Sequence, residues 1–247
     1  MPELPEVETI RRQLSQKIVG KKFEGKLIAS ISRRGKMLLI NFSDQESLVF
    51  HLKMTGQLIF NGKETKHTRK IFQFEDKSFL IFNDLRKFGW FKLVKNADQL
   101  KEIQQLGPDA LFVKEQEFAS SLLQRKTAKI KPLLLDQKFL AGIGNIYADE
   151  VLFDSKIHPL RQVKSLKKQE VAKLFCSIKK ILKKAIEKRG SSAKDYLDGL
   201  GNKGSYLAFH QVYQKTGQPC PVCKMPIQRI KISQRSSHFC PNCQKET

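Results

Sequence analysis

The first residues of the chain have the side chains and the backbone group for covalent chemistry. Position 2 is Pro2, and a small residue there lets the initiator Met1 be removed, which would expose a secondary amine. An α-amino group has a pKa of about 7.7–8, against about 10.4 for a lysine, so more of it is unprotonated at neutral pH. A proline amine that attacks the aldehyde carbon of a sugar gives an iminium directly, as in Schiff-base enzymes. Glu3 and Glu6 lie beside it and could move protons, although they could equally favour a helix start by the dipole effect alone.

Four of the five cysteines form two CxxC pairs with sixteen residues between them. Each pair places two thiolates on one tight turn, which is the spacing of a zinc ribbon. A disulfide is disfavoured because the cytosol keeps thiols reduced, and a redox role would need one CxxC beside a βαβ unit. We therefore expect one structural Zn²⁺ in a C-terminal ribbon, and we expect the fifth cysteine, Cys176, in the core. The four predicted ligands are Cys220, Cys223, Cys240 and Cys243.

The charge of the chain points to a polyanionic partner. Its 247 residues carry 46 Lys+Arg against 24 Asp+Glu, a formal net charge of +22, with 40% hydrophobic residues. This composition is typical of a globular protein. A positive charge excess of this size most often indicates a protein that binds nucleic acid, and binding to an anionic membrane surface is the second possibility. The chain has no apolar run of about 18 residues, which excludes a transmembrane helix. Its start also lacks the basic and apolar stretches of a secretory signal, so we expect a cytoplasmic protein.

The apolar periodicity predicts an α+β multidomain fold. Residues 3–18 show a helical stripe, residues 26–94 consist of short β-rich runs separated by turn signals, and the pattern is helical from about 98. Residues 190–219 are Gly-rich and polar, which suggests a functional loop. The expected strands are 37–42, 47–52, 70–74, 78–82 and 88–94, and the expected helices after residue 107 are 115–124, 132–136, 145–154 and 165–188. The expected domains are an N-terminal β-sandwich with an N-terminal helix (1–109), a helical domain (115–210) and a zinc ribbon (211–247).

Two basic segments have both an ordinary and a functional interpretation. Residues 161–189 contain eleven Lys/Arg and two Glu, which by itself is typical of a solvated helix face. The stretch between the cysteine pairs carries Arg229, Lys231 and Arg235, either in a solvated loop or in a finger that reaches phosphate. The net charge favours the second interpretation for both segments.

Several motifs, in order along nearly the whole chain, resemble the formamidopyrimidine-DNA glycosylase family of bacterial enzymes that excise oxidised guanine. PELPEVET at 2–9 resembles the family's start, and SRRGKMLL at 32–39 its β-domain lysine segment. HLKMTG at 51–56 and DLRKFGW at 84–90 are similar to the loops with its DNA-inserting residues. IKPLLLDQKFLAGIGNIYADE at 130–150 resembles its helix–two-turn–helix motif, and the zinc ribbon completes the set. Ordered motifs in one chain are far more specific than any single motif.

The resemblance implies a base-excision-repair enzyme that removes oxidised purines from double-stranded DNA and then cleaves the strand by β/δ-elimination. Pro2 would be the nucleophile and Glu3 the proton donor. Lys36 would assist β-elimination and bind phosphate, and Arg235 would assist δ-elimination or hold phosphate. Glu6 and Glu150 resemble family residues near the reaction centre or the lesion pocket. No sign of more than a monomer is present.

The resemblance also implies DNA contacts. Excision requires the damaged nucleotide to leave the base stack, and other groups must fill the hole. Met54, Arg86 and Phe88, called the wedge residues below, are suited to this. From composition alone, Met54 and Phe88 would be core residues, but the surrounding Lys53, Lys87 and Gly56 favour a surface loop. Further predicted DNA contacts are His67, Lys126, Lys131 and Asn145.

The chain departs from the family pattern at three places, none of them catalytic. The β domain is short between Ile28 and Ser32, Leu85 replaces a frequent proline, and Gln214 replaces a frequent glycine. The loop at 198–209 is expected to cover the flipped base, and its details are unusual.

Two other functions are compatible with part of the sequence, namely excision of oxidised pyrimidines and DNA binding without catalysis. A relative acting on oxidised pyrimidines usually begins PEGPE, and Leu4 argues against it. A non-catalytic zinc-ribbon DNA-binding protein is disfavoured because Pro2, Glu3, Lys36 and Arg235 are all present.

Overall fold

The structure, a computed structural model, describes residues 1–193 and 195–246, and the chain divides into two compact units. The N unit comprises Met1–Gln105 and Ala185–Ala208, and the C unit comprises Leu106–Lys184 and Phe209–Thr247. Residues 185–208 therefore belong to the same compact unit as the sandwich, and the ribbon belongs to the same unit as the helices of 106–184. The division into three domains (1–109, 115–210 and 211–247) remains a prediction.

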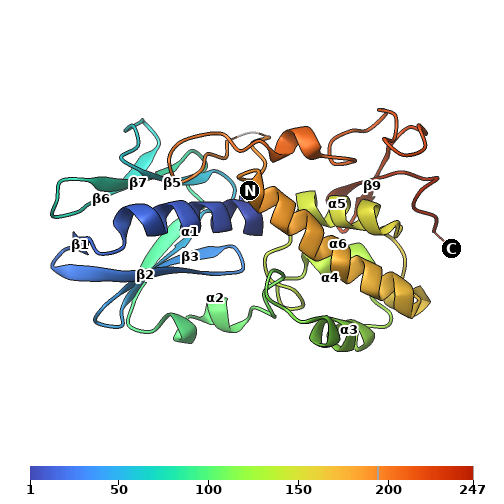
Figure 1. Cartoon of the computed structure of the whole chain (residues 1–247), viewed down its shortest axis with the longest axis horizontal. Coiled ribbons are helices and arrows are strands. Elements are labelled where there is room, and N and C mark those ends of the chain that lie inside the picture. Colours follow the sequence, from blue (N-terminus) through green and yellow to red (C-terminus); the bar gives the residue numbers. More distant parts are fainter. Residues whose placement is uncertain (194, 247) are drawn as a thin grey trace. The chain divides into compact units, whose positions relative to one another are not determined.

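The N unit is built on two antiparallel sheets, which confirms the predicted sandwich (Figure 1). Alternate side chains of each strand point inward, so Leu38, Ile40 and Phe42 of one strand enter the core while Asn41 faces away from it. The rings of Phe50, Phe72 and Phe82 meet between the sheets. The first sheet has the order β1 (Lys22–Phe23), β2 (Lys26–Arg34), β3 (Met37–Phe42), β4 (Ser47–His51) and β8 (Trp90–Val94), and the second has the order β5 (Gly56–Phe60), β7 (Phe79–Asp84) and β6 (Thr68–Gln73).

Helix α1 (Leu4–Ile18) packs its apolar stripe against both sheets of the sandwich. Val7, Ile10, Leu14 and Ile18 are fully buried, at the spacing of one helix face. The helix ends just before Gly20, whose φ of 86° suits glycine. The predicted helix at 3–18 is therefore confirmed, and its N-terminus lies at the first residues of the chain.

The C unit contains the predicted helical segment and the ribbon. Helices α4 (Ile130–Leu135) and α5 (Asn145–Ser155) are joined by a loop that ends at Gly144, the N-cap of α5. The ribbon hairpin pairs β9 (Gln228–Ile232) with β10 (Arg235–Phe239). The remaining helical segments of the chain are η1 (Ala97–Gln99), α2 (Lys101–Gln104), α3 (Glu115–Leu123), η2 (Val163–Ser165), α6 (Lys168–Glu187) and η3 (Tyr206–Phe209). No helix among the described residues is both long enough and apolar enough to cross a membrane.

Helix α6 corrects one expectation. Leu174, Ile178 and Leu182 form its buried stripe, whereas Cys176 is exposed. Two residues advance a helix by about 200°, so Cys176 lies almost opposite Leu174 and faces solvent. The expectation that Cys176 belongs to the core was wrong.

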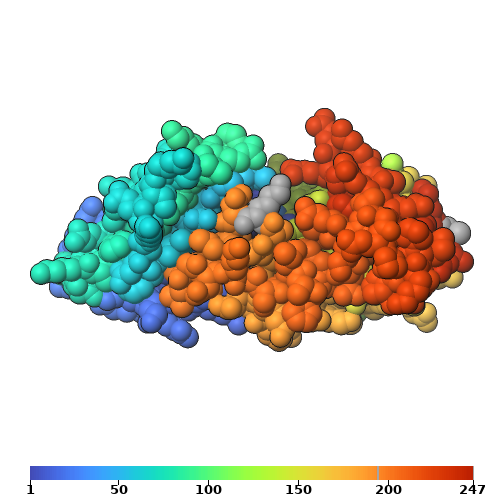
Figure 2. All heavy atoms as spheres, turned by 90° about the horizontal axis from the view of Figure 1, so that it is seen from above, coloured from blue at the N-terminus to red at the C-terminus, as the bar shows by residue number. Residues whose placement is uncertain are grey.

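The predicted loop at 190–219 consists mostly of irregular backbone, and the buried carboxylate of Asp198 fixes part of it. Asp198 is fully buried and accepts hydrogen bonds from the N–H groups of Leu200 (3.0 Å) and Asn202 (2.9 Å). The segment is joined to the sandwich, since Phe60 N donates to Gly199 O at 2.9 Å. Figure 2 shows this orange segment against the blue-to-cyan surface of the sandwich. The loop is thus fixed at its base, and its role over a flipped base remains a prediction.

Candidate active site and zinc centre

The residues that follow Met1 at the start of the N unit are buried and held by hydrogen bonds. Pro2 is buried, and Glu3 is the N-cap of α1. The Glu3 side chain accepts the backbone N–H of Glu6, while Glu6 Oε2 accepts Glu3 N at 2.8 Å, a reciprocal capping box. Glu6 is 1% exposed, and its other oxygen accepts Ser191 N at 2.8 Å. A Cβ on Gly190 would lie 2.8 Å from the Glu6 side chain, so this close approach requires glycine.

Burial and neighbouring charges act on the amino terminus in opposite directions. Burial lowers the pKa of the Met1 amino group, Glu3 and Glu6 raise it by their negative charges, and the charge of Lys36 lowers it. Lys36 is itself buried, and its electrostatic effect places it near the chain start. The structure therefore brings together Glu3, Glu6 and Lys36 around the amino terminus.

The turn that carries Lys36 is tied to α1 by Arg33, which was not predicted. Arg33 Nη1 donates to Gly35 O at 2.8 Å, and Arg33 Nε donates to Glu8 Oε2 at 3.0 Å. Glu8 is buried, which opposes ionisation, yet hydrogen bonds from Arg11, Arg12 and Arg33 lower its pKa to about 2. Glu8 is therefore a fixed anion at neutral pH and anchors the Lys36 turn.

His51 is a second residue that the sequence analysis missed, although it lies inside the HLKMTG motif. Burial, with the charges of Lys53 and Lys36, lowers its pKa to about 4, so the ring is neutral at pH 7. Its Nδ1 accepts Lys53 N at 3.0 Å, which leaves the ring proton on Nε2. Because the charge of Lys36 contributes to the lowered pKa of His51, the Nε2–H donor of His51 lies near Lys36.

The three wedge residues lie at the surface of the N unit. Met54 is 39% exposed and Phe88 is 56% exposed, which confirms the surface-loop prediction against core packing. Arg86 is exposed as well, and its guanidinium carbon lies 4.8 Å from the centre of the Phe88 ring. Large exposed apolar side chains of this kind mark binding surfaces when they cluster.

Lys131 and Asn145 of the C unit bind the tip of the ribbon hairpin. Lys131 Nζ and Asn145 Nδ2 each donate to Ser236 O at 2.9 Å, next to the exposed Arg235. Lys131 is fully buried and also pairs with Asp149 Oδ1 at 2.5 Å, so its ammonium faces protein rather than solvent. Asp149 was not predicted, because its partners lie 18 and 89 residues away and only tertiary structure joins them.

Glu150 holds the backbone that precedes the ribbon. Its carboxylate accepts the N–H groups of Gln211 (2.8 Å), Val212 (3.0 Å) and Tyr213 (2.9 Å). Burial raises its pKa, and these hydrogen bonds oppose the rise. In this arrangement Glu150 orders the chain leading to the ribbon.

The four predicted zinc ligands converge at the base of the ribbon. The Sγ atoms of the four cysteines lie within 4.8 Å of one another, with Cys223–Cys240 at 3.4 Å and Cys220–Cys243 at 3.9 Å. Zinc–sulfur bonds of about 2.3 Å in a tetrahedron place sulfurs about 3.8 Å apart, so the cluster fits one Zn²⁺. A four-thiolate site without an open position is structural rather than catalytic.

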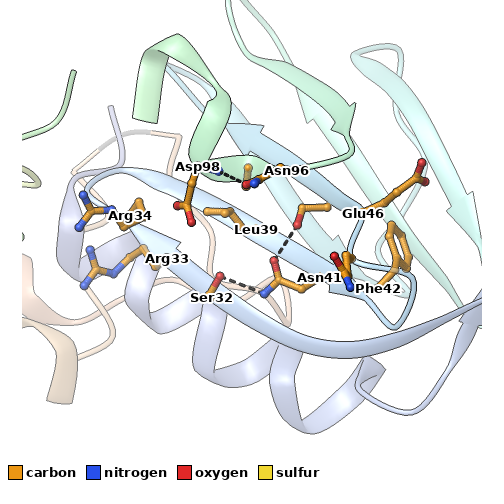
Figure 3. Close-up of a pocket in the computed structure, with 12 residues that line it drawn as sticks. Ser32, Arg33, Arg34, Leu39, Asn41, Phe42, Glu46, Asn96 and Asp98 are labelled. Atoms are coloured by element: carbon orange, nitrogen blue, oxygen red, sulfur yellow. Dashed lines mark hydrogen bonds between the residues drawn. The ribbon is translucent and has the colours of Figure 1, made fainter. Parts of the chain in front are cut away.

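A polar pocket of about 380 Å³ lies on the face of the first sheet that points away from the core (Figure 3). Asn41 Nδ2 donates to Ser32 Oγ at 3.0 Å, and Ser47 Oγ donates to Asn41 Oδ1 at 3.0 Å. These bonds cross β2, β3 and β4 and fix their register. Arg33 and Arg34 line one end, and none of the predicted site residues lines the pocket.

A capped helix start beside a buried lysine, exposed wedge loops and a four-cysteine ribbon on a strongly basic chain are the features of one class of protein, the enzymes that act on nucleic acid. Three family models match successive segments of the chain. Residues 21–91 match the formamidopyrimidine-DNA glycosylase N-terminal domain, residues 106–196 its H2TH domain, and residues 217–245 the zinc finger found in FPG and IleRS.

Full-length relatives extend the match. A formamidopyrimidine-DNA glycosylase of Pelotomaculum thermopropionicum is 42% identical and covers 99% of both chains. The Lactococcus lactis Fpg in complex with DNA containing an abasic site has a TM-score of 0.89 at 38% identity, covering 98% of this chain and 99% of that one. A MutM complex with carbocyclic 8-oxo-G DNA has a TM-score of 0.88 at 37% identity, covering 99% and 100%. The chain belongs to the formamidopyrimidine-DNA glycosylase family.

Proposed function

We propose that the chain removes oxidised purines, namely 8-oxoguanine and formamidopyrimidines, from double-stranded DNA and then cleaves the strand at the abasic site. The observation that carries this proposal is the chain start, where buried Pro2 adjoins the capping box of Glu3 and Glu6 and the electrostatic influence of the buried Lys36. The same surroundings would lower the pKa of the Pro2 amine once Met1 is removed, which is the direction that a Schiff-base nucleophile needs.

In the proposed reaction, removal of Met1 exposes the secondary amine of Pro2. This nitrogen attacks C1′ of the flipped nucleotide, the C1′–N9 bond breaks, and the base leaves with a proton supplied by Glu3. The Pro2 nitrogen then loses its proton, the C1′–O4′ bond breaks and O4′ takes up a proton, which leaves an iminium between Pro2 and the opened sugar. Loss of a proton from C2′ expels the 3′ phosphate in β-elimination, which Lys36 assists. Loss of a proton from C4′ then expels the 5′ phosphate in δ-elimination, with help from Arg235.

The proposed DNA contacts divide into two groups. The wedge residues fill the hole left by the flipped nucleotide, and Arg86 hydrogen-bonds to the partner base. His67, Lys126 and Asn145 bind phosphates, with Asn145 at the N-terminus of α5, where backbone N–H groups also face an anion.

For Lys131 we propose a different role from the direct DNA contact expected from the sequence. Its buried ammonium holds Ser236 O and thereby positions the adjacent Arg235. The zinc ion would fix the other end of the same hairpin. We further propose that the protein acts as a monomer in the cytoplasm.

Borohydride reduction tests the proposal. The protein is incubated with duplexes that contain 8-oxoguanine, a formamidopyrimidine or an oxidised pyrimidine, and covalent adducts are separated by gel electrophoresis. We expect adducts with the two purine lesions, and loss of the adduct in Pro2→Gly. Preferential trapping with the oxidised pyrimidine would favour the alternative substrate class, and no adduct with any lesion would favour a non-catalytic DNA-binding protein.

A further inference from the structure

We propose that Asp84 is the positioning residue that sets the predicted DNA-contacting loops of the N unit in register. The inference rests on the proposed function, because it concerns the loops that would fill the hole in the base stack. Asp84 is the last residue of β7, the central strand of the second sheet, and is 1% exposed.

The carboxylate of Asp84 joins the two loops that carry the wedge residues. Its Oδ1 accepts Thr55 Oγ1 at 2.5 Å and Arg86 N at 3.2 Å, and its Oδ2 accepts Gly89 N at 2.6 Å. The Thr55 hydroxyl oxygen also accepts Arg86 N, at 3.0 Å. Thr55 follows Met54 directly, while Arg86 and Gly89 bracket the turn that presents Phe88. One buried carboxylate therefore fixes the backbone beside all three wedge side chains.

The backbone of Asp84 fixes a third segment. Its N–H donates to His67 O at 2.9 Å, and its Cα pairs with Gly56 across the β5–β7 ladder. His67 is a predicted phosphate contact. The main chain and the side chain of Asp84 thus hold the backbone beside four predicted DNA contacts of the N unit, namely His67 and the three wedge residues.

The wedge side chains need such support because packing cannot hold them. Met54 and Phe88 are exposed, and residues 85–89 contain no proline, so the turn lacks the rigidity of a proline ring. Hydrogen bonds from backbone N–H groups to a carboxylate are stronger than neutral ones. A site held in its working geometry before binding loses less free energy on ordering when the ligand arrives. The Asp84 carboxylate supplies that rigidity.

The turn is also built closely around this carboxylate. A Cβ on Gly89 would lie 3.0 Å from Asp84 Oδ2 and 2.9 Å from the Phe82 ring. A Cβ on Gly56 would lie 2.5 Å from Leu52 O. Gly89 therefore approaches β7 at a distance that only glycine allows, and Gly56 allows the close turn onto Leu52 in the loop that carries Met54, which is consistent with one preformed arrangement.

Two substitutions and one conservative variant test the inference. Thr55→Val keeps the shape of the side chain and removes the hydroxyl that links the loops, Thr55→Ser keeps the hydroxyl, and Asp84→Asn keeps the shape of the acceptor while removing its charge. Single-turnover base removal is measured on an 8-oxoguanine duplex that carries 2-aminopurine in the undamaged strand, whose fluorescence rises when side chains unstack the bases. Borohydride trapping on a single-stranded abasic oligonucleotide, which has no stack to open, is the comparison.

We expect Thr55→Val and Asp84→Asn to slow base removal from the duplex about tenfold and to diminish the 2-aminopurine rise, because buried hydrogen bonds to a charged group are lost. Trapping on the single-stranded abasic site should stay within about twofold of the parent, and Thr55→Ser should behave like the parent on both substrates. If Asp84→Asn does not fold, the results for Thr55→Val alone test the positioning role of Asp84.

Parental rates on the duplex for Thr55→Val, or equal losses on both substrates, would overturn the role of Asp84. Absence of any adduct with the parent protein on either substrate would instead overturn the proposed function, so the two failures are distinguishable.

Discussion

The guanidinium of Arg86 lies over the ring of Phe88, with 4.8 Å from its central carbon to the ring centre. A cation held over an aromatic face is stabilised by about 0.5–1 kcal/mol at an exposed site. Two of the wedge residues are therefore paired with each other in the protein alone. They must separate if Phe88 enters the base stack while Arg86 reaches the partner base.

This pairing predicts a selective effect of Arg86→Ala. Base removal from a lesion duplex should fall by about tenfold or more, since the contact of Arg86 with the partner base is lost. Affinity for undamaged DNA should fall only as much as in Lys63→Ala, a variant of an exposed cation in another loop. Fluorescence anisotropy and single-turnover rates give the two quantities, and equal losses in both would count against the wedge role.

The glutamate that anchors the Lys36 turn predicts a pH dependence of stability. The pKa of Glu8 is about 2 in the folded protein against an ordinary value of 4.5. A lowered pKa contributes stability above the ordinary value, and this contribution is lost as the pH falls from 4.5 towards 2. At pH 7, Glu8→Gln should therefore reduce the free energy of unfolding by about 2–3 kcal/mol.

Urea denaturation at several pH values checks this expectation. The difference between the parent and Glu8→Gln should shrink steadily below pH 4.5, while Glu64→Gln, which changes an exposed carboxylate, should track the parent at every pH. A difference that does not depend on pH would show that Glu8 acts by packing alone.

The left-handed backbone conformation of Gln214, which precedes the ribbon, predicts a stabilising substitution. Gln214 is exposed and has a φ of 60°, a left-handed conformation that costs a residue with a Cβ about 1 kcal/mol. Gln214→Gly removes this strain, partly offset by the greater freedom of glycine in the unfolded chain, for a net gain of about 0.5 kcal/mol. Urea denaturation measures the gain, and Gln218→Gly, at an ordinary φ, should not stabilise.

The zinc centre predicts that removal of zinc weakens DNA binding while the N unit stays folded. Chelation of zinc, or Cys240→Ser, should disorder the ribbon and release Arg235, so DNA affinity should fall. The single tryptophan, Trp90, lies in β8 of the N unit, and its fluorescence should show that this unit stays folded. Cys176→Ser, at the exposed cysteine of α6, is the matched control and should change neither quantity. Unchanged affinity after zinc removal would exclude the ribbon as a DNA contact.

These residues also show what a sequence can and cannot predict. The four cysteines and the stripe of α1 were predictable because ligand spacing and helical periodicity are local. The strand β2 was missed because its polar and apolar residues alternate weakly, and β5 because it begins with Gly56, a residue that is depleted in strands. The burial of Lys131 and the links made by Arg33, Asp84 and Asp149 were not predictable, since each depends on partners that tertiary structure alone brings together.

The most direct test of the central claim is the identity of the residue that bonds to DNA. The borohydride-reduced adduct with an 8-oxoguanine duplex is digested with nuclease and protease, and mass spectrometry locates the sugar remnant. Attachment to the nitrogen of Pro2, in a peptide that lacks Met1, is the result we predict. Attachment to a lysine such as Lys36, or strand cleavage by a protein that retains Met1, would contradict the account.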